Sequence, residues 1–475
     1  MSLREGWEMV IGLEVHTELK TRTKMFCSCE NVFGAEPNTK VCPVCLGLPG
    51  SLPVLNARAV ELAMAIGTAL HSRISPSTFH RKNYFYPDMP KDFQISQYDL
   101  PINVGGYLDL PDGTQVRIER AHLEEDTGKS THLGSTGRIH GAERSLVDYN
   151  RSGVPLVEIV SGPDMRTSAQ ARLYASELRG ILIATGASDG RMEEGSMRID
   201  ANVSVHRPDE PFGTRCEIKN LNSLRSLTRA IDFEAERQLA LIEEGGVVRQ
   251  ETRHWDENLG ATSTMRSKEE AEDYRYFREP DLVDLAPDAA WQERVRDALG
   301  PMPAQRRSAL LGHVVEATTA QRDFVDVVVD LGFDDYVMAA VEAGADAGLA
   351  LARAANELAA NAESVANLSR DAFVSALQME QAGEISPTQA KQVLSELLAH
   401  GGDPREIAAA HGFEQLSSDS LGDAVAAVIE ASPEEWSRYK DGDDKLAQYF
   451  IGQVMKLTKG QANGKAVVAE LQDRR

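Results

Sequence analysis

The spacing of apolar residues changes once along this chain, near Pro301-Met302-Pro303, and the change divides the sequence into two kinds of structure. Upstream, short alternating runs such as residues 198–206 are punctuated by glycine and proline, which is typical of strands with one buried face. Downstream, the chain is rich in alanine, leucine and acidic residues, and strand patterns nearly vanish. We therefore expect an N-terminal α+β part with an all-helical part after it.

Helices are expected on both sides of this division. In the first part, residues 57–70 and 168–185 carry apolar side chains at helical spacing. In the second part, Ser386 is the expected N-cap of a helix with Pro387 at its first position and Gly401 at its end. The second part is thus predicted to be built from packed helices.

The C-terminal stretch predicts a further compact helical unit. A capping box is expected at Ser432, with Glu435 at the third helical position. At roughly 150 residues per domain, a chain of 475 residues holds about three domains. We place the boundaries so that the domains comprise residues 1–290, 291–406 and 407–475.

The chain is strongly acidic, with 50 Lys and Arg residues against 73 Asp and Glu residues and a formal net charge of −23. Such a charge repels a phosphate backbone and excludes simple electrostatic wrapping of DNA. Residues 445–475 are locally basic, with Lys456 and Lys459 among their cations, so this end either contacts a polyanion or solvates a helical face. The sequence has neither an apolar stretch of about 18 residues nor a secretory start, and a cytoplasmic protein is expected.

Four of the five cysteines form two close pairs, Cys27 with Cys29 and Cys42 with Cys45. Two turns with this spacing can present four thiolates tetrahedrally to zinc. Disulfide pairing is the alternative, and a reducing compartment favours zinc over it. The fifth, Cys216, lies in an alternating run and is interpreted as a small core residue. A four-thiolate site leaves no open position for substrate, so chemistry is expected elsewhere.

Three segments place acidic side chains close together in sequence. Glu14, His16 and Glu18 share one face of an expected strand at residues 10–19. Two other segments, around residues 122–126 and 198–206, add the acids Glu124, Glu125, Asp126 and Asp200.

If these acids converge, their oxygen-rich set suits Mg²⁺ or Mn²⁺ bound together with nucleotide phosphates. The alternative is that each set is the solvated face of an amphipathic strand. The Gly128-Lys129-Ser130 sequence is not a P-loop, because Leu123 stands where that motif requires glycine. Any ATP site is therefore of another type.

Aromatic residues accompany a lysine at residues 82–88, where Lys82 precedes Tyr84, Phe85 and Tyr86. Such a segment either stacks an unpaired base or forms a loop over the core.

Read together, several segments resemble the GatB subunit family of glutamine-dependent aspartyl/glutamyl-tRNA amidotransferases. The resemblance runs in order over essentially the whole chain, including residues 453–456 and 460–463 near its end. It is carried by Ile11-Gly-Leu-Glu-Val-His16, Val41-Cys-Pro-Val-Cys-Leu-Gly-Leu-Pro-Gly50, Lys82-Asn-Tyr-Phe-Tyr-Pro-Asp88, Gln94-Ile-Ser-Gln-Tyr98, His122-Leu-Glu-Glu-Asp126, Met192-Glu-Glu-Gly-Ser196 and Tyr274-Arg-Tyr-Phe277.

The resemblance implies an ATP-dependent reaction on misacylated tRNA. Glu on tRNA(Gln) or Asp on tRNA(Asn) is phosphorylated on its side-chain carboxylate, and ammonia then displaces the phosphate. The sequence holds no Ser-Ser-Lys amidase signature, so a GatA-like amidase partner is expected to make the ammonia from glutamine. A small GatC-like chain would complete a heterotrimer.

The resemblance also implies roles for particular residues. It places magnesium ligands at Glu14, His16, Glu124, Glu125 and Asp200. All of these except Glu124 are also expected to be catalytic. His16 serves either as a ligand or as a group that positions the phosphate or a metal-bound water. Further expected contacts are Glu217 and Lys219 for the nucleotide, and Lys82, Tyr84, Lys456 and Lys459 for tRNA.

In fold, the resemblance implies an N-terminal cradle domain whose antiparallel sheet is related to glutamine synthetase, then a helical domain and a small helical tail that contacts tRNA. Some relatives keep the four cysteines as a zinc site near the tRNA 3′-end, so zinc here would be structural or positional.

Two rival functions are kept open by the residues alone. A non-catalytic zinc-ribbon scaffold that binds RNA would explain the cysteines and the basic tail, but not the clustered acids. A carboxylate-metal hydrolase would explain the acids and would cleave RNA without glutamine, ammonia or a partner.

Overall fold

The structure is a computed structural model that describes residues 3–134, 142–267, 274–413, 418–458, 462 and 464–475. The chain divides into two compact units, Met1–Met302 and Pro303–Arg475. The first is α+β and the second is helical, as the change in apolar spacing near residue 301 predicts. No helix in the described ranges is long and apolar enough to cross a membrane.

The first unit is built on a large twisted sheet, which has 13 strands among the described residues. The pairing along its main path is antiparallel except between β12 and β13. In spatial order the path runs β14 (Ala261–Ser267), β13 (Glu251–Asp256), β12 (Cys216–Leu221), β11 (Met197–His206), β1 (Glu8–Glu18), β10 (Pro155–Ser161), β7 (Gln115–Glu125), β4 (Phe93–Gln97), β3 (Phe79–Asn83) and β15 (Phe277–Arg278). Of the short strands, β5 (Asn103–Val104) and β6 (Tyr107–Asp109) pair with β7, and β2 (Arg73–Ile74) pairs with β5. Strand β8 (Lys129–Gly134) pairs separately with β9 (Ala142–Asp148).

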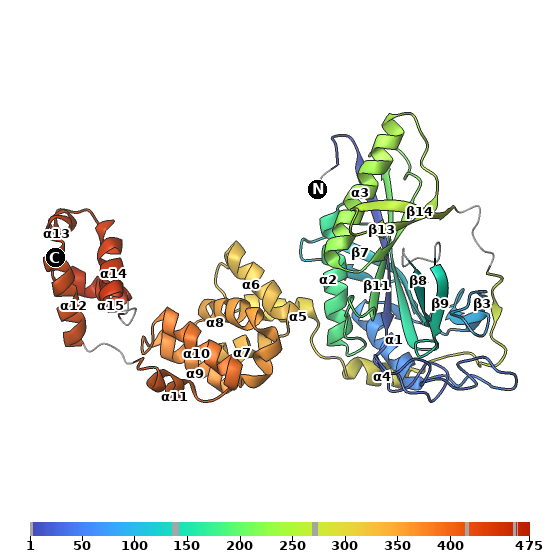
Figure 1. The fold of residues 1–475 in the computed structure, drawn as a ribbon, viewed down its shortest axis with the longest axis horizontal. Helices are drawn as coiled ribbons and strands as arrows, with labels where there is room; N and C mark the ends of the chain where they lie inside the picture. The colour runs from blue at the N-terminus through green and yellow to red at the C-terminus, as the bar shows by residue number, and fades with distance from the viewer. Residues whose placement is uncertain (1–2, 135–141, 268–273, 414–417, 459–461, 463) are drawn as a thin grey trace. The chain divides into compact units, whose positions relative to one another are not determined.

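Three helices cover one face of the central strands: α1 (Ala57–Ala69), α2 (Ser168–Ala184) and α3 (Leu224–Glu243) (Figure 1). The predicted helices at 57–70 and 168–185 are confirmed within one residue. Under the helices, Ile11, Leu13 and Val15 of β1 are almost completely buried in the core. The other face of β1 carries Glu14 and His16, so the alternation in the sequence correctly divides this strand between core and site.

The first unit extends past the predicted boundary at residue 290. Helix α4 (Ala289–Asp297) packs against α1, and Val295 belongs to the core of this unit. The Trp291 indole also donates a hydrogen bond to Glu61 of α1, at 3.2 Å. The helix therefore completes the first unit, and the chain passes to the second at Pro303.

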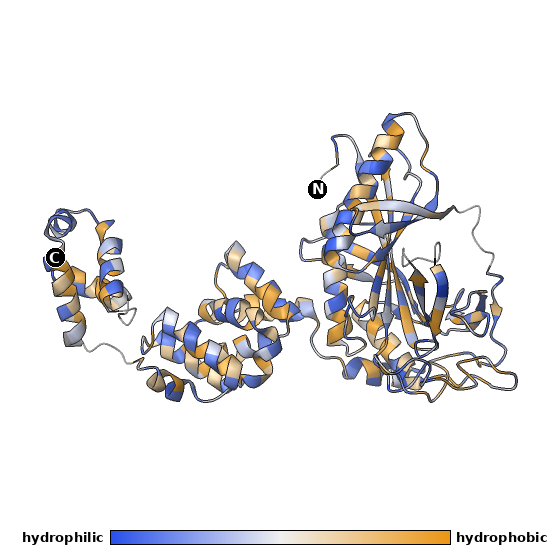
Figure 2. Ribbon diagram, in the orientation of Figure 1, coloured by the Kyte–Doolittle hydropathy of each residue, from blue (hydrophilic) through white to orange (hydrophobic). Residues whose placement is uncertain are grey.

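In the second unit, a first group of helices encloses one core, and its members are α5 (Pro303–Leu311), α6 (Thr319–Asp330), α7 (Asp334–Glu342), α8 (Ala347–Arg353), η2 (Ala354–Leu358), η3 (Ala362–Asn367), α9 (Arg370–Gln381), α10 (Pro387–His400) and α11 (Pro404–Ala410). Hydrophobic and hydrophilic residues alternate around these helices (Figure 2), which is the two-sided pattern of helices packed on a core. The predicted cap of α10 is confirmed, since Ser386 and Gln389 form a capping box. The predicted boundary at 406 falls inside α11, whose Ala408 packs in this core.

A separate core near the C-terminus is enclosed by α12 (Ser418–Ala431), α13 (Pro433–Lys440), α14 (Leu446–Leu457) and α15 (Gly464–Asp473). The helix predicted after Ser432 is present, but the capping box is wrong. Ser432 makes no side-chain cap, and its hydroxyl lies 3.2 Å from the Tyr449 hydroxyl instead. The backbone of Ser432, at φ −134° and ψ 59°, lies outside the extended conformation from which Thr167, Ser223 and Ser386 cap their helices.

Candidate functional site

Polar side chains from neighbouring strands meet on the face of the sheet opposite the helices. The register sets Glu14 of β1 against Asp200 of β11, and His16 of β1 against Glu158 of β10. Glu158 in turn pairs with His122 of β7. Directly paired residues point to the same side of a sheet, so the register alone brings these side chains together.

Five of these side chains form a compact group that we call the acid centre. Its members are His16, Glu124, Glu158, Glu14 and Asp200. His16 Nε2 lies 3.3 Å from Glu158 Oε2 and 3.9 Å from Glu124 Oε1. One ligand atom each from these three residues lies within 4.8 Å of the others, a spacing that a metal ion can bridge. The imidazole and carboxylate donors suit a divalent cation such as Mg²⁺ or Mn²⁺.

Lysine and arginine side chains partly balance the carboxylates. Lys219 of β12 lies 2.5 Å from Asp200 and 2.9 Å from Glu217. Arg198 Nη2 donates to Asp126, which directly follows β7, at 2.6 Å. Glu14 instead accepts a hydrogen bond from the Asn202 amide, at 2.9 Å.

The pKa values in and beside the acid centre diverge. Burial, followed by repulsion from Glu158 and Glu217, raises the pKa of Glu14. Burial and the negative charge of Asp126 raise the pKa of Glu18 to about 7. Burial acts in the same direction on Glu158, but the imidazoles of His122 and His16 lower its pKa overall. Carboxylates held this close repel one another and favour binding of a cation.

The acid centre borders two cavities, and a third lies beside Glu18 on the same strand. The central one, of about 310 Å³, is lined by His16, Glu124, Glu158 and Asp200 together with the cations Lys82, Arg198 and Lys219. Glu14 lines a second cavity of about 440 Å³, which also holds Arg120 and Arg215. Glu18 lines a third of about 620 Å³, with Lys129, Arg151 and Arg191.

The aromatic segment at residues 82–88 contributes to the central cavity. Lys82 and Tyr84 line it, and the Lys82 ammonium lies 4.7 Å from the ring centroid of Tyr274. Tyr84 and Tyr86 stack with ring centroids 5.1 Å apart. Aromatic rings therefore border a cavity that is otherwise lined by charged groups.

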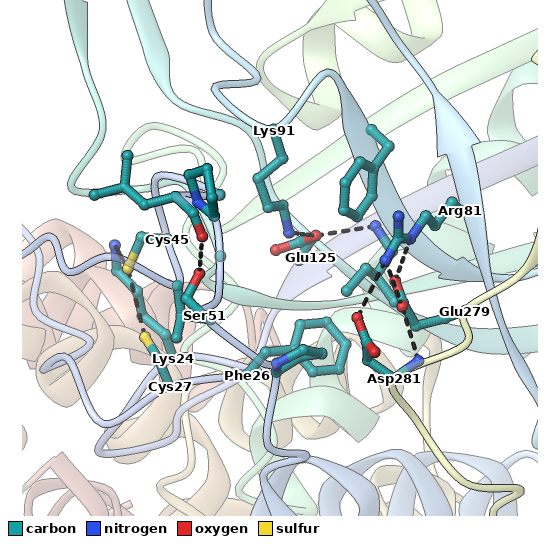
Figure 3. Close-up of a pocket in the computed structure, with 18 of the residues that line it drawn as sticks. Lys24, Phe26, Cys27, Cys45, Ser51, Arg81, Lys91, Glu125, Glu279 and Asp281 are labelled. Atoms are coloured by element: carbon teal, nitrogen blue, oxygen red, sulfur yellow. Dashed lines mark hydrogen bonds and ion pairs between the residues drawn. The ribbon is translucent and has the colours of Figure 1, made fainter.

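Glu125 does not join the acid centre. Successive residues of a strand point to opposite faces, so Glu125 of β7 points away from Glu124. Its carboxylate is buried, forms an ion pair with Lys91 and accepts the Ile95 N–H at 2.9 Å. Figure 3 shows this pair near Arg81 and Glu279. These residues line a separate cavity of about 210 Å³.

Sequence reasoning missed Glu158. Its signal is a single carboxylate inside the apolar run Pro155–Ser161. Most of the residues that the sequence did predict lie in the acid centre or beside it. They are Glu14, His16, Glu124, Asp200, Glu217, Lys219, Lys82 and Tyr84.

The four cysteines at residues 27–45 converge. Cys45 Sγ lies 3.4 Å from Cys27, 3.6 Å from Cys42 and 3.7 Å from Cys29. A zinc tetrahedron with Zn–S bonds of about 2.3 Å has sulfur–sulfur edges of about 3.8 Å, so the donor set fits zinc. The fifth cysteine, Cys216, is buried in the sheet and makes no part of this cluster.

Comparisons with known proteins cover both units. The family described as "GatB/GatE catalytic domain" matches residues 9–293, and the one described as "GatB domain" matches residues 335–474. The chain belongs to the GatB family.

Curated GatB proteins match this chain over almost its full length. A protein of Frankia casuarinae is 49% identical over 97% of this chain and 94% of its own length. A protein of Moorella thermoacetica is 47% identical over 98% of this chain and 99% of its own length. A protein of Mycobacterium tuberculosis is 47% identical over 97% of this chain and 93% of its own length. Each is named as the B subunit of an aspartyl/glutamyl-tRNA(Asn/Gln) amidotransferase.

The part that matches the GatB domain includes the helices to which the sequence assigns tRNA contacts. Lys456 lies in the last turn of α14 and is exposed. Lys459 lies outside the residues that the structure describes.

Proposed function

We propose that this chain is the B subunit of a tRNA-dependent amidotransferase. It would use ATP to phosphorylate the side-chain carboxylate of Glu on tRNA(Gln), of Asp on tRNA(Asn), or of both, and ammonia would then displace the phosphate. The observation that carries the proposal is the meeting of carboxylates and cations from β12, β11, β1, β10 and β7 on one sheet face, in a chain of the GatB family.

Transfer of a phosphoryl group to a carboxylate brings two anions together, so the site must supply positive charge. We assign His16, Glu124 and Glu158 to holding Mg²⁺, with Glu14 and Asp200 beside them. Bound there, Mg²⁺ would neutralise charge on the ATP phosphates. We assign Glu158 as a magnesium ligand in place of Glu125, which the sequence predicts for that role. Glu125 instead faces the cavity that also contains Lys91.

The cations of the central cavity have their own task in this proposal. Lys82, Arg198 and Lys219 line it, and Lys219 with Glu217 lies next to Asp200. We assign them to the charges that develop on the phosphate and on the carboxylate that receives it. The cavities beside Glu14 and Glu18 leave room on both sides of the centre for the two substrates.

Zinc in the four-cysteine cluster is proposed to be structural, because four thiolates leave no open coordination position. The proposal also requires partners that the chain does not supply. A GatA-like amidase would release ammonia from glutamine, and a GatC-like chain would join the two in a cytoplasmic heterotrimer. Lys456 and Lys459 would contact the tRNA phosphates.

The experiment supplies the chain, alone and with its amidase and small partner, with Glu-tRNA(Gln) or Asp-tRNA(Asn), ATP and Mg²⁺. Ammonium should support amidation by the chain, whereas glutamine should do so only when the partners are present. RNA cleavage would favour a hydrolase. Bound but unaltered tRNA in every combination would favour a non-catalytic scaffold.

A further inference from the structure

Lys24 is a fully buried lysine whose ammonium group lies between the four-cysteine cluster and a distant turn of the chain. Its Nζ donates to the carbonyls of Ser152 and Tyr149, at 2.7 and 3.2 Å, and lies 3.6 Å from Cys45 Sγ. Its main-chain N–H donates to the Cys29 carbonyl, at 3.0 Å. Figure 3 shows Lys24 beside Cys45 and Cys27. One residue therefore contacts the cysteine cluster through both its backbone and its side chain.

The charge of Lys24 needs a negative partner. A buried ammonium is strongly unfavourable when no opposite charge accompanies it. Within the described ranges, its hydrogen-bond acceptors are two neutral carbonyls and one sulfur atom, and none is a carboxylate. Glu125 lines the same cavity, but its carboxylate pairs with Lys91, so four neutral thiols would leave the Lys24 ammonium without a negative partner of its own. Four thiolates around Zn²⁺ carry excess negative charge, so the metal-loaded cluster is the state that fits Lys24.

The turn at residues 149–153 links this lysine to Asp126, which lines the central cavity beside the acid centre. Gly153 accepts the Met25 N–H at 2.8 Å and donates its own N–H to the Asp126 carbonyl at 2.9 Å. Arg151 in the same turn lies 3.7 Å from the Asp126 carboxylate. Strand β10, which carries Glu158, begins two residues after the turn, at Pro155.

We propose that Lys24 is a positioning residue that balances the charge of the metal-loaded cysteine cluster and fixes the turn at residues 149–153 in response to metal. The ammonium holds the two carbonyls of that turn while the anionic cluster holds the ammonium. The inference rests on the proposed zinc site and is independent of the amidation reaction.

The first test compares zinc release from Lys24→Met and Lys40→Met in the full chain. Lys40 is the matched control, because it lies between the two cysteine pairs, is partly exposed and forms an ion pair with Glu30. With excess chelator, Lys24→Met should release zinc at least about tenfold faster than the wild type, the usual scale for groups that support metal ligands. Lys40→Met should release it at the wild-type rate, and equal rates in the two variants would overturn the proposal.

The second test needs no substitution and stands even if Lys24→Met does not fold. Hydrogen exchange is measured on the wild-type chain with and without zinc at the amides of Ser152, Gly153 and Val154. These amides donate to Tyr149, Asp126 and Arg151 carbonyls. Removing zinc should speed their exchange while α3 keeps its protection. Unchanged exchange at the turn, or a wild-type chain that binds no zinc, would contradict the proposal.

Discussion

The four-cysteine cluster and the acid centre are built in different ways. The cluster comes from one segment, residues 27–45, whereas the acid centre takes its side chains from strands as far apart in sequence as β1 and β11. Local spacing therefore predicts the first site almost completely. The second depends on which strands become neighbours and in which register, and this is why it was predicted only in part.

The largest effect is expected from Glu158, the member of the acid centre that only the fold supplies. Glu158→Gln should lower ATP-dependent amidation by about 1,000-fold, because it removes a proposed metal ligand and leaves His16 without its nearest acid. The thermal midpoint should change little. Amidation with ammonium in the assembled complex measures the effect.

Glu244→Gln is the control for that substitution, since Glu244 is exposed and lies beyond the end of α3. It should keep wild-type activity. Near-normal activity of Glu158→Gln would remove the metal assignment.

Glu234 is a buried acid that lies outside both sites, and its charge is balanced by cations within the structure. Burial alone would raise the pKa of its carboxylate, but the hydrogen bonds that it accepts from Arg237 and Gln238 lower the pKa overall. Glu234→Gln should cost about 3 kcal/mol of unfolding free energy at pH 7, since it leaves Arg237 and Arg253 without their buried partner.

The pH dependence of that cost follows from the lowered pKa. The carboxylate contributes stability above its ordinary pKa of 4.5, and the contribution is lost as the pH falls through the folded value. Urea unfolding should therefore show a gap between wild type and variant that is constant from pH 7 to 5 and narrows below pH 4.5. A gap that widens on acidification would show that the charge of Glu234 is not what stabilises the fold.

Two adjacent glutamates give the sharpest comparison between the sheet faces. Glu124→Gln should weaken Mg²⁺-dependent ATP binding by at least about tenfold, while Glu125→Gln should leave it nearly unchanged. Glu125→Gln should instead lower stability, because it leaves Lys91 without its buried partner. Calorimetric titration with ATP and Mg²⁺ separates the two. Equal weakening would mean that both residues act on one site.

The smallest effect concerns the tail. Lys456→Ala removes one exposed cation from α14, so tRNA affinity should fall by a few-fold. The slope of log affinity against log salt concentration should become shallower by about one. ATP turnover without tRNA should not change. A loss of tRNA binding that does not depend on salt would indicate that the substitution disturbs the helix and not a phosphate contact.

The sequence predicts the burial of β1 correctly because strand alternation is local. The same rule applied to β7 places Glu124 and Glu125 on opposite faces of the sheet. Treating residues 122–126 as one acidic cluster overlooked this difference between them. Glu158 could not be found by spacing, since its role depends on β10 pairing between β1 and β7. The boundary at 290 was placed too early because nothing in the composition of α4 shows that it packs back onto α1.

The most direct measurement of the central claim follows an oxygen atom. Glu-tRNA(Gln) labelled with a heavy oxygen isotope in its side-chain carboxylate is amidated by the assembled complex with ATP, Mg²⁺ and ammonium, and the phosphate released is analysed by mass. If the chain phosphorylates the carboxylate, each phosphate released with Gln-tRNA carries one labelled oxygen, and Glu158→Gln yields almost none. Unlabelled phosphate accompanying normal formation of Gln-tRNA would contradict the account.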